Sequence, residues 1–394
     1  MKKGMRTAEK TMKITQIFKI YWPDNGGGIA KVMESIAEAF AGCRQEMIVC
    51  QSDRHKRSRD DRYQGIPVHR CRQLFTCVST PVSLEFLLEV KRRTADSDVV
   101  IYHFPYPMAD LAVLLGMYSG KLIVWWHCGF EKYRKLAPLY GMLVRHTLKK
   151  ADQILVSSRG NLKHCALLRQ YQYKCRVIPF CVSDECLQRG MEYTAKPQDA
   201  NGRITILFIG RLVWYKGCDV LLKAFAKMQA RTADCRLVLV GSGPMEKELK
   251  RLAVSLGLAH VIFAGMVSEE EKIKWLERCD FFVLPSVSKA EAFAVVQIEA
   301  MAFGKPVINT RLPSGVPYVS LDGVTGKTVR PGSVRELAAA MQELAENDSL
   351  RERFGENARK RVQKKYTQRV MTEKYRQLFA QLFEPEPEHL EEAQ

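Results

Sequence analysis

The sequence predicts an α/β protein with two doubly wound, parallel-sheet domains. Three observations carry this prediction: the length of the chain, its apolar content, and a regular alternation of short apolar runs with amphipathic stretches. With 394 residues, the chain is long enough for two cores at about 100–200 residues each. Hydrophobic residues make up 46% and charged residues 26%, which is typical of a globular protein and excludes disorder or coiled coil as the main state.

The apolar runs have the length of buried strands, and the stretches between them have the periodicity of amphipathic helices. This alternation is typical of parallel sheets with helical crossovers. We expect strands at 14–21, 47–51, 99–103, 122–126, 153–157, 176–179, 204–209, 237–240, 261–263, 281–284 and 307–309. We expect helices at 29–41, 133–149, 220–230, 245–256, 269–278 and 293–303.

The alternation is interrupted once, in a stretch with few apolar residues that contains Gly190, Pro197 and Gly202. We interpret it as a linker between the two domains. In doubly wound sheets, ligands bind beyond the carboxyl ends of the strands, so functional residues should follow the strands directly. The expected organisation is a first domain at 1–185, a linker at 186–203, a second domain at 204–366, a helix at 367–385 that packs back toward the first domain, and a tail at 386–394.

The chain is strongly basic, with a formal net charge of +18. Residues 1–190 contain 31 Lys and Arg against 17 Asp and Glu, so this half carries most of the excess. Such a charge predicts attraction to an anionic partner, either nucleic acid, a phosphorylated ligand or an acidic membrane face. A solvated basic surface without a specific partner is the alternative.

The 12 cysteines are scattered and show no zinc-site spacing, which suits a reducing cytosol better than a disulfide framework. The basic amino terminus leads into no apolar segment of a signal peptide. No apolar stretch approaches the ~20 residues that span a bilayer. These features predict a cytoplasmic protein that touches a membrane at most peripherally.

A glycine-flanked basic loop follows the expected strand 204–209. It contains Gly210, Arg211, Lys216 and Gly217, and a helix is expected after it. Backbone amides and the positive end of that helix, together with one guanidinium and one ammonium group, suit a phosphate ligand. Two solvated basic side chains are the simpler alternative.

Two glutamates, Glu291 and Glu299, follow the expected strand 281–284. On a continuous helix, a spacing of eight residues would separate them by about 12 Å along the axis and about 80° around it. They could then bind the hydroxyl groups at the two ends of an extended ligand. A buried structural ion pair is the alternative, since Glu299 lies in an otherwise apolar run.

In the first half, Gly26, Gly27 and Gly28 follow the first strand, and His127 follows the strand 122–126. Three glycines allow the backbone to approach a ligand closely, although the pattern is not a dinucleotide fingerprint. An ordinary flexible turn and a structural histidine are the alternatives for these two features.

Three other motifs carry weaker signals. The Asp96-Ser97-Asp98 triplet has the spelling of a metal-binding DxD motif, but it precedes a strand and so lies at the wrong edge of the sheet. The loop 241–244 is explained equally well by a tight turn or by a ligand approach. The basic run 54–59 is expected to be a solvated loop, with contact to acidic lipid head groups as the lesser possibility.

Taken together, these motifs resemble the retaining nucleotide-sugar glycosyltransferases of family 4, over nearly the whole chain. The most specific element is the pair Glu291 and Glu299 with the segment 300–307, followed by the loop 210–217. The resemblance implies the GT-B architecture, in which two Rossmann-like domains face each other across a cleft. It also implies retaining transfer of a hexose from a GDP- or UDP-linked sugar, without a metal or other cofactor.

The resemblance also implies roles for single residues of the second domain. Arg211 and Lys216 would neutralise the diphosphate leaving group, with Gly210 beside it. Glu291 would bind hydroxyls of the donor sugar, and Glu299 would bind the ribose. In the family the leaving phosphate is proposed to accept the acceptor's proton, so no separate general base is expected.

The remaining implied contacts come from backbone and from the first domain. Amides near Phe293 and Ala294 would face the phosphate and the sugar. Gly27 and Gly28 would close over the diphosphate, and His127 would contact the sugar.

Two positions depart from the family pattern. Ala294 stands where glycine is usual, so its methyl group narrows the backbone approach and a positive φ would be costly. Gly129 stands where related sequences often have aspartate, so any contact made by that carboxylate is missing here.

The expected function is hexose transfer to a lipid-linked glycan on the anionic inner face of the cytoplasmic membrane, in bacterial surface polysaccharide biosynthesis. The alternatives are a nucleotide-sugar epimerase of the same architecture and a non-catalytic basic binding subunit. Nucleic acid is not an expected partner, because no aromatic–basic stripe is present. We expect Arg211→Ala and Lys216→Ala each to lower turnover by ~10²–10³ with folding intact.

Overall fold

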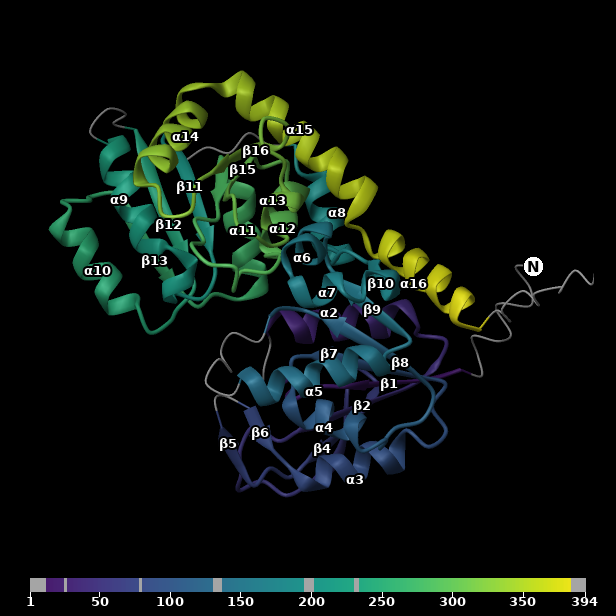
Figure 1. Cartoon of the computed structure of the whole chain (residues 1–394). Coiled ribbons are helices and arrows are strands. Elements are labelled where there is room, and N and C mark those ends of the chain that lie inside the picture. Colours follow the sequence, from purple (N-terminus) through teal and green to yellow (C-terminus); the bar gives the residue numbers. More distant parts are fainter. Residues whose placement is uncertain are drawn as a thin grey trace, which may run out of the picture. The chain divides into compact units, whose positions relative to one another are not determined.

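The computed structural model describes residues 12–24, 27–77, 80–129, 137–194, 202–229 and 234–383. The chain divides into two compact units (Figure 1). Residues 1–155, 171–178 and 369–394 form the first, here called the N-unit. Residues 156–170 and 179–368 form the second, the C-unit. Each unit therefore takes its residues from separate stretches of the chain.

The N-unit contains an eight-stranded sheet. Its central pairings, from β8 through β7, β1 and β2 to β4, are parallel, and the edge strand β3 pairs with β4 in the antiparallel direction. The strand order is β10 (Cys175–Val177), β9 (Gln153–Val156), β8 (Lys121–Trp126), β7 (Val99–Phe104), β1 (Lys13–Ile17), β2 (Arg44–Cys50), β4 (Ile66–Cys71) and β3 (Arg59–Tyr63).

Helices and a small hairpin complete the N-unit. The strand order reverses direction between β1 and β7, and the crossover from β1 to β2 runs through α2. The elements are α2 (Gly28–Ala39), α3 (Leu84–Arg93), α4 (Pro107–Leu114), α5 (Ala137–Lys150), α16 (Gln368–Phe383) and the pair β5 (Phe75–Cys77) and β6 (Thr80–Val82).

The C-unit contains a six-stranded parallel sheet. Its order is β13 (Val261–Gly265), β12 (Cys235–Val240), β11 (Ile204–Ile209), β14 (Phe281–Val283), β15 (Val307–Thr310) and β16 (Gly326–Val329). In sequence order this is 3-2-1-4-5-6, the order of dinucleotide-binding Rossmann sheets. The direction of winding changes between β11 and β14, and ligands bind at the carboxyl ends of the strands at such a point.

The helices of the C-unit connect these strands and continue beyond them. They are α6 (Arg159–His164), α7 (Ala166–Arg169), α8 (Asp184–Glu192), α9 (Cys218–Gln229), α10 (Glu246–Ser255), α11 (Glu269–Arg278), α12 (Val296–Ala302), α13 (Val316–Val319), α14 (Val334–Glu346) and α15 (Asp348–Lys365).

Apolar burial explains why the central strands are uninterrupted hydrophobic runs. In β11, Ile206, Leu207 and Phe208 are all fully buried, because helices cover both faces of a parallel sheet. One face packs into a core that includes Phe225 of α9 and Met341 of α14. This core fixes the position of β11, and with it the start of the loop at Gly210.

The predicted α/β class with two parallel sheets is confirmed, while several boundaries differ. The first strand ends at Ile17 rather than at residue 21, and α12 begins at Val296 rather than at residue 293. The expected linker begins inside α8, and residues 195–201 lie outside the described residues, as does the tail 386–394. Elements without a prediction include the strands β3 to β6 and β16 and the helices α3, α4, α14 and α15.

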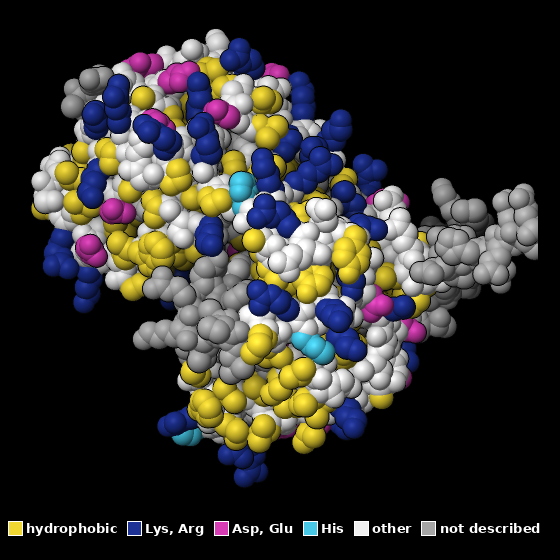
Figure 2. All heavy atoms as spheres, viewed as in Figure 1, with side chains coloured by type: hydrophobic (Ala, Val, Ile, Leu, Met, Phe, Trp, Pro, Cys, Tyr) yellow, Lys and Arg dark blue, Asp and Glu magenta, His cyan; other side chains and the backbone are white. Residues whose placement is uncertain are grey.

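Two surface properties bear on partners. In the part of the chain that the structure describes, no helix is both long enough and apolar enough to cross a membrane. All twelve cysteines are free thiols. On the face shown in Figure 2, Lys and Arg side chains outnumber acidic ones over both units, in line with the formal charge of +18.

Candidate functional site

The loops after β11 and β12 pack backbone against backbone at the carboxyl edge of the C-unit sheet. A Cβ added to Gly241 would lie 2.1 Å from the carbonyl oxygen of Gly210, and Gly241 has φ +126°. A Cβ added to Gly243 would lie 2.3 Å from the carbonyl oxygen of Leu212. Only glycine permits this approach, which supports the tight-turn explanation for the two glycines of the loop 241–244.

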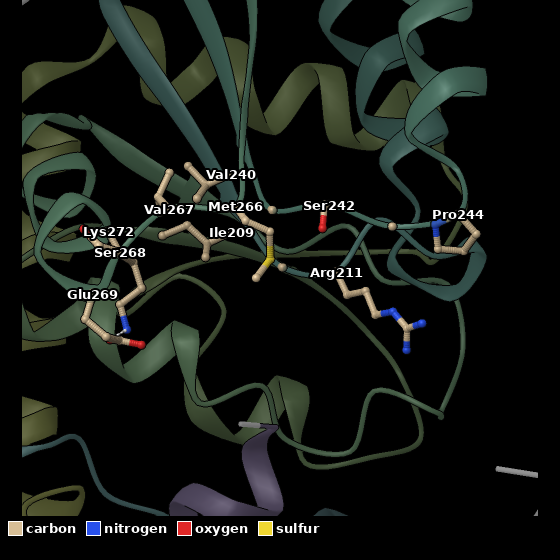
Figure 3. A pocket seen from close by; sticks show the side chains of 13 residues that line it. Ile209, Arg211, Val240, Ser242, Pro244, Met266, Val267, Ser268, Glu269 and Lys272 are labelled. Atoms are coloured by element: carbon tan, nitrogen blue, oxygen red, sulfur yellow. Dashed lines mark ion pairs between the residues drawn. The ribbon is translucent and has the colours of Figure 1, made fainter. Parts of the chain in front are cut away.

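A cavity of about 620 Å³ opens between these loops and the start of α11. In Figure 3, Glu269 and Lys272 lie at one end of the lining, Arg211 and Pro244 lie at the other, and Ile209 and Met266 lie between them. The full lining is Ile209, Gly210, Arg211, Val240, Gly241, Ser242, Gly243, Pro244, Met266, Val267, Ser268, Glu269 and Lys272. The cavity therefore combines an apolar middle with charged ends.

Lys216 lies buried beside this cavity. The 3₁₀ turn Trp214–Lys216 ends at Gly217, which has φ +68°, and a Cβ on Gly217 would lie 2.3 Å from the carbonyl oxygen of Pro285. The backbones of Gly217 and Pro285 therefore pack closely together, and this packing fixes the turn against the loop that follows β14. A Cβ on Gly210 would lie 3.5 Å from the Lys216 ammonium, so that ammonium borders the cavity wall.

Glu291 is the ion-pair partner of Lys216. Its Oε2 lies 2.6 Å from the Lys216 Nζ and also accepts a 3.0 Å hydrogen bond from the Ser286 hydroxyl. Both residues are less than a tenth exposed. Burial by itself would lower the pKa of Lys216, but the adjacent carboxylate outweighs it and the pKa is raised. Lys216 is therefore a fixed positive charge in a poorly solvated position.

Glu299 forms a second buried ion pair, with a lysine of α11. Lys272 Nζ lies 3.0 Å from Glu299 Oε1 and 2.5 Å from Glu269 Oε2. Burial opposes the charge of Lys272, yet the two carboxylates raise its pKa. Because Lys272 and Glu269 line the cavity, Glu299 is connected directly to the cavity's acidic and basic end.

Arg211 differs from both lysines because it is exposed. It lies at the opposite end of the lining from Lys272 (Figure 3). Among the described residues, no ion pair of its guanidinium is found. Arg211 can therefore meet an anionic ligand without first breaking a contact within the protein.

The expected helical spacing of the two glutamates is wrong. Glu291 lies in the irregular segment after β14, and α12 begins only at Val296. Ala294 has φ +61°, a left-handed conformation that interrupts any helix there. The figures of about 12 Å and about 80° therefore do not apply, since they assumed one continuous helix.

The segment around Ala294 presents backbone donors. Phe293 is buried and packs edge-on against Phe180, with ring centroids 4.9 Å apart. The Gln297 side chain donates to the Phe293 carbonyl, and the Gln297 amide donates to the Ala294 carbonyl. Within the described ranges, no protein acceptor is found for the amides of Phe293 and Ala294.

The remaining predicted residues belong to the N-unit. Gly27 precedes α2 with φ −72°, and a Cβ on Gly28 would meet no atom within 4 Å. The protein's own packing therefore does not require glycine at position 28. Asn25 and Gly26 lie outside the described residues.

His127 follows β8 and is 4% exposed. Its ring stacks on Trp125 at 4.6 Å, and its Nε2 lies 2.9 Å from Nδ1 of His103. Burial, and then the neighbouring His103, lower the pKa of His127 well below its usual range. His127 is therefore a neutral imidazole at physiological pH.

Sequence reasoning missed Lys272, Glu269 and Met266. In the sequence, Glu269 and Lys272 have the i, i+3 spacing of an ordinary ion pair on a surface helix. The one signal for a role in the site was that α11 directly follows β13, at the carboxyl edge of the sheet. The DxD-like triplet has structural contacts instead: Asp96 pairs with Lys13 at 2.5 Å, and Asp98 accepts the Lys13 amide at 2.7 Å.

A Rossmann-type sheet with closely packed glycine loops, and with ion-paired lysines and carboxylates beyond the carboxyl ends of its strands, is typical of nucleotide-binding α/β enzymes. Comparison with known families makes this specific. Residues 27–181 match the glycosyl transferase 4-like domain, and residues 192–361 match the glycosyl transferases group 1 family. The chain belongs to the group 1 glycosyltransferases.

Curated relatives match over nearly full length. The O-antigen chain mannosyltransferase C of Escherichia coli is 32% identical over 375 residues, covering 95% of this chain and 99% of the relative. The D-rhamnosyltransferase WbpZ of Pseudomonas aeruginosa is 30% identical over 368 residues, covering 90% and 92%.

Solved structures show the same GT-B fold. The sucrose-phosphate synthase of Thermosynechococcus elongatus superposes with a TM-score of 0.72 at 21% identity, covering 94% of this chain and 99% of that one. The Anabaena protein HepE in complex with UDP-glucose gives a TM-score of 0.72 at 18% identity, covering 94% and 100%.

Proposed function

We propose that this glycosyltransferase moves mannose or a closely related hexose from a nucleotide diphosphate sugar to a lipid-linked glycan, with retention, during assembly of a bacterial surface polysaccharide. The observation that carries the proposal is the arrangement at the β11–β14 switch point. Arg211 and Lys216 supply positive charge there, and Glu291 and Glu299 supply carboxylates. The names of the two relatives that match over nearly full length, a mannosyltransferase and a rhamnosyltransferase of surface glycans, support the sugar class.

The two ion pairs hold the site ready for an anionic donor. When the diphosphate enters, Lys216 turns its ammonium to the phosphate and Arg211 adds a two-pronged contact. Glu291 then exchanges its lysine partner for hydroxyls of the donor sugar, and Glu299 binds the ribose. Charge that develops on the departing diphosphate is stabilised by groups that are already in place.

The acceptor's proton leaves on the same face as the diphosphate. The bond from the anomeric carbon to the diphosphate oxygen breaks, and a bond to the acceptor hydroxyl oxygen forms. The leaving phosphate oxygen takes the hydroxyl proton. His127 contacts the sugar and Gly27 and Gly28 cover the diphosphate, as the family resemblance implies.

A GDP-linked donor is the first choice. A GDP-mannose-dependent mannosyltransferase of Mycolicibacterium smegmatis is 28% identical over 258 residues, covering 63% of this chain and 67% of the relative. The UDP complexes of HepE share the fold only, at 18% identity. The apolar middle of the cavity, with Ile209 and Met266, receives the nucleoside.

The lipid-linked acceptor is reached from an anionic membrane surface, through an exposed apolar face of the N-unit. Leu84 and Leu88, one helical turn apart on α3, are each 62% exposed, and Leu74 and Phe75 are each 51% exposed. Hydrophobic side chains gather over β5, β6 and α4 in Figure 2.

The basic run 54–59 lies next to this apolar face, because Ser58 donates to Glu85 of α3. Its residues Arg54 and Arg57 are exposed. Apolar side chains beside exposed cations are the combination that anionic bilayers bind, at about 1 kcal/mol for each Lys or Arg near the surface.

A donor panel tests the proposed reaction. The protein is incubated with GDP-mannose, GDP-rhamnose, UDP-glucose or UDP-N-acetylglucosamine, together with an undecaprenyl-diphosphate-linked oligosaccharide. We expect release of GDP from one GDP-sugar only in the presence of acceptor, with an α-linked product by NMR. An epimerised donor in reactions without acceptor, or no transfer from any donor, would overturn the proposal.

Vesicle binding tests the membrane proposal. Sedimentation with phosphatidylglycerol–phosphatidylethanolamine vesicles should recover the protein, and phosphatidylcholine vesicles should recover much less. The double substitution Leu84→Gln/Leu88→Gln should lower the bound fraction several-fold, while Val254→Gln, at a position 81% exposed in the C-unit, serves as the matched control. Equal binding by both variants would exclude this face.

A further inference from the structure

A chain of buried hydrogen bonds crosses three neighbouring strands of the N-unit sheet. Gln16 of β1 donates from Nε2 to the Met33 carbonyl of α2 at 3.0 Å. Its Oε1 lies 2.9 Å from Nε2 of His103 on β7, and Nδ1 of His103 lies 2.9 Å from Nε2 of His127 after β8. All three side chains are at most 4% exposed.

The hydrogen bond to the Met33 carbonyl determines which group donates and which accepts in each of the following hydrogen bonds. The Met33 carbonyl can only accept a hydrogen bond, so the amide nitrogen of Gln16 must face it. The Gln16 oxygen is then the group that faces His103, and this oxygen also can only accept. His103 must therefore carry its proton on Nε2.

The position of the proton on His103 also determines the position of the proton on His127, because both rings are neutral. Burial lowers the pKa of His103 to about 3, and burial together with His103 lowers the pKa of His127 well below its usual range. A neutral imidazole carries a single N–H group. With that proton on Nε2, His103 has a lone pair on Nδ1 and accepts from Nε2–H of His127.

The same reasoning then fixes the second nitrogen of His127. Its single proton is on Nε2, so Nδ1 carries a lone pair. The stack on Trp125, at 4.6 Å and 6° between planes, fixes the plane of the ring, and the hydrogen bond to His103 fixes which edge carries Nε2. Trp125 is held in turn by a 2.6 Å hydrogen bond from its Nε1 to the Tyr375 hydroxyl.

We propose that Gln16 and His103 are positioning residues that lock His127 in its Nε2–H tautomer, so that His127 meets the donor sugar as a hydrogen-bond acceptor. The part that concerns the sugar rests on the proposed function, while the tautomer itself does not. The ligand group at Nδ1 must then be a donor, such as a sugar hydroxyl. A phosphate oxygen is the wrong chemistry there, and His127 cannot pass a proton from Nδ1 to the leaving group.

Nitrogen NMR of the full chain, labelled with ¹⁵N-histidine, reads the tautomer directly. The chain has 8 histidines, and the His127 signals are those lost in His127→Asn. From pH 6 to pH 8 we expect a protonated Nε2 and an unprotonated Nδ1 for both His103 and His127. A proton on Nδ1 of His127, or a doubly protonated ring, would overturn the proposal whether or not transfer activity has been found.

Two substitutions of His103 separate hydrogen-bond direction from packing. His103→Asn keeps an oxygen near the Nδ1 position, which can accept from His127, whereas His103→Leu has similar bulk and no acceptor. We expect His103→Leu to give a mixture of His127 tautomers and a KM for the donor raised by up to about 10-fold at similar kcat. His103→Asn should restore the tautomer and most of the affinity.

A purely structural role predicts the opposite order, because leucine suits a buried strand better than asparagine. Should His103→Leu fail to fold, Gln16→Met provides a second test. It removes the oxygen that accepts from His103 Nε2, and should therefore produce the same mixture of tautomers at His127. A tautomer mixture with unchanged KM would refute the contact with the sugar while leaving the lock in place. An unchanged tautomer in a folded variant would refute the lock.

Discussion

At the scale of single residues, the cations of the site differ in what they hold before the ligand arrives. Arg211 is exposed and borders the cavity, whereas Lys216 is buried against Glu291 at 2.6 Å. Sequence analysis located both because they follow β11 directly. It could not distinguish them, since the partner of Lys216 lies 75 residues further along the chain, in a segment whose backbone departs from a helix.

The two alanine substitutions should therefore differ in stability, contrary to the expectation from sequence that both leave folding intact. Arg211→Ala should lower turnover by ~10²–10³ at unchanged stability. Lys216→Ala should lower turnover similarly and also destabilise the protein by about 3–5 kcal/mol, because it leaves a buried carboxylate without its counter-charge. Urea unfolding and donor turnover measure the two effects.

The double variant Lys216→Ala/Glu291→Ala completes this comparison. Removing both charges should recover most of the lost stability while activity stays low. If Lys216→Ala alone unfolds at the wild-type urea concentration, the ion pair is not the structural contact that its burial indicates.

Ala294 offers a test of backbone strain. Its φ of +61° is unfavourable for a residue with a Cβ by roughly 1–2 kcal/mol, and glycine adopts it freely. Ala294→Gly should raise the free energy of unfolding by about 1 kcal/mol, measured by urea denaturation. Ala290→Gly, at an exposed position four residues earlier, should be neutral or destabilising. Equal shifts in the two variants would argue against strain.

At the scale of elements, the sequence was most informative where burial is complete. The central strands β7, β8 and β11 are uninterrupted apolar runs, and their predicted positions agree with the structure to within two residues. The edge strand β3 reads Arg-Asp-Asp-Arg-Tyr, and its stability comes from antiparallel pairing with β4, which leaves no apolar alternation to detect. The late start of α12 could not be predicted from residue preference, since alanine normally favours a helix, and the glycine usual at position 294 was the one indication of an irregular backbone there.

Asp110 connects three elements of the N-unit and is fully buried. Its carboxyl group accepts from Tyr102 of β7 at 2.8 Å and from Tyr140 and Thr147 of α5 at 2.7 and 2.8 Å. Burial outweighs these three hydrogen bonds and raises the pKa of Asp110 to about 7. The group therefore stays protonated in the folded protein at mildly acidic pH, while it ionises near its ordinary pKa when unfolded.

This shift makes stability depend on pH in a stated direction. The contribution of Asp110 is complete below its unfolded pKa near 3.8 and is lost as the pH rises through about 7. Relative to Asp110→Asn, the wild type should become less stable between pH 5 and pH 7, by at most about 1.4 kcal/mol per pH unit. Urea unfolding of both proteins at pH 5, 6, 7 and 8 measures the difference. Parallel curves would mean that the carboxyl group is ionised throughout.

At the scale of the whole molecule, neither unit is a continuous piece of chain. The helix α16, near the carboxyl end, packs on the N-unit: Phe379 stacks on Phe40 at 4.6 Å, and Tyr375 accepts from Trp125. The helices α6 and α7 belong to the C-unit although they lie between the N-unit strands β9 and β10. Sequence periodicity finds such helices but does not say which core they cover.

Removal of α16 should affect the two units differently. A chain that ends at Gln368 loses the cover over Phe40 and Trp125, so we expect the N-unit to melt at a lower temperature in calorimetry. The C-unit keeps its cavity and should still be stabilised by GDP, by about 2.7 kcal/mol at 100 times the Kd. A chain that ends at Phe383 is the control. Unchanged melting of the N-unit without α16 would show that this helix adds nothing to its core.

The position of α16 also has a consequence for biosynthesis. While the nascent polypeptide is still on the ribosome, the aromatic rings of Phe40 and Trp125 lack their final neighbours, since Tyr375 follows Trp125 only 250 residues later and Phe379 lies further still along the chain. The N-unit is therefore started before the C-unit and completed after it. A premature stop anywhere before Tyr375 leaves the apolar surface around Phe40 and Trp125 accessible to chaperones and proteases.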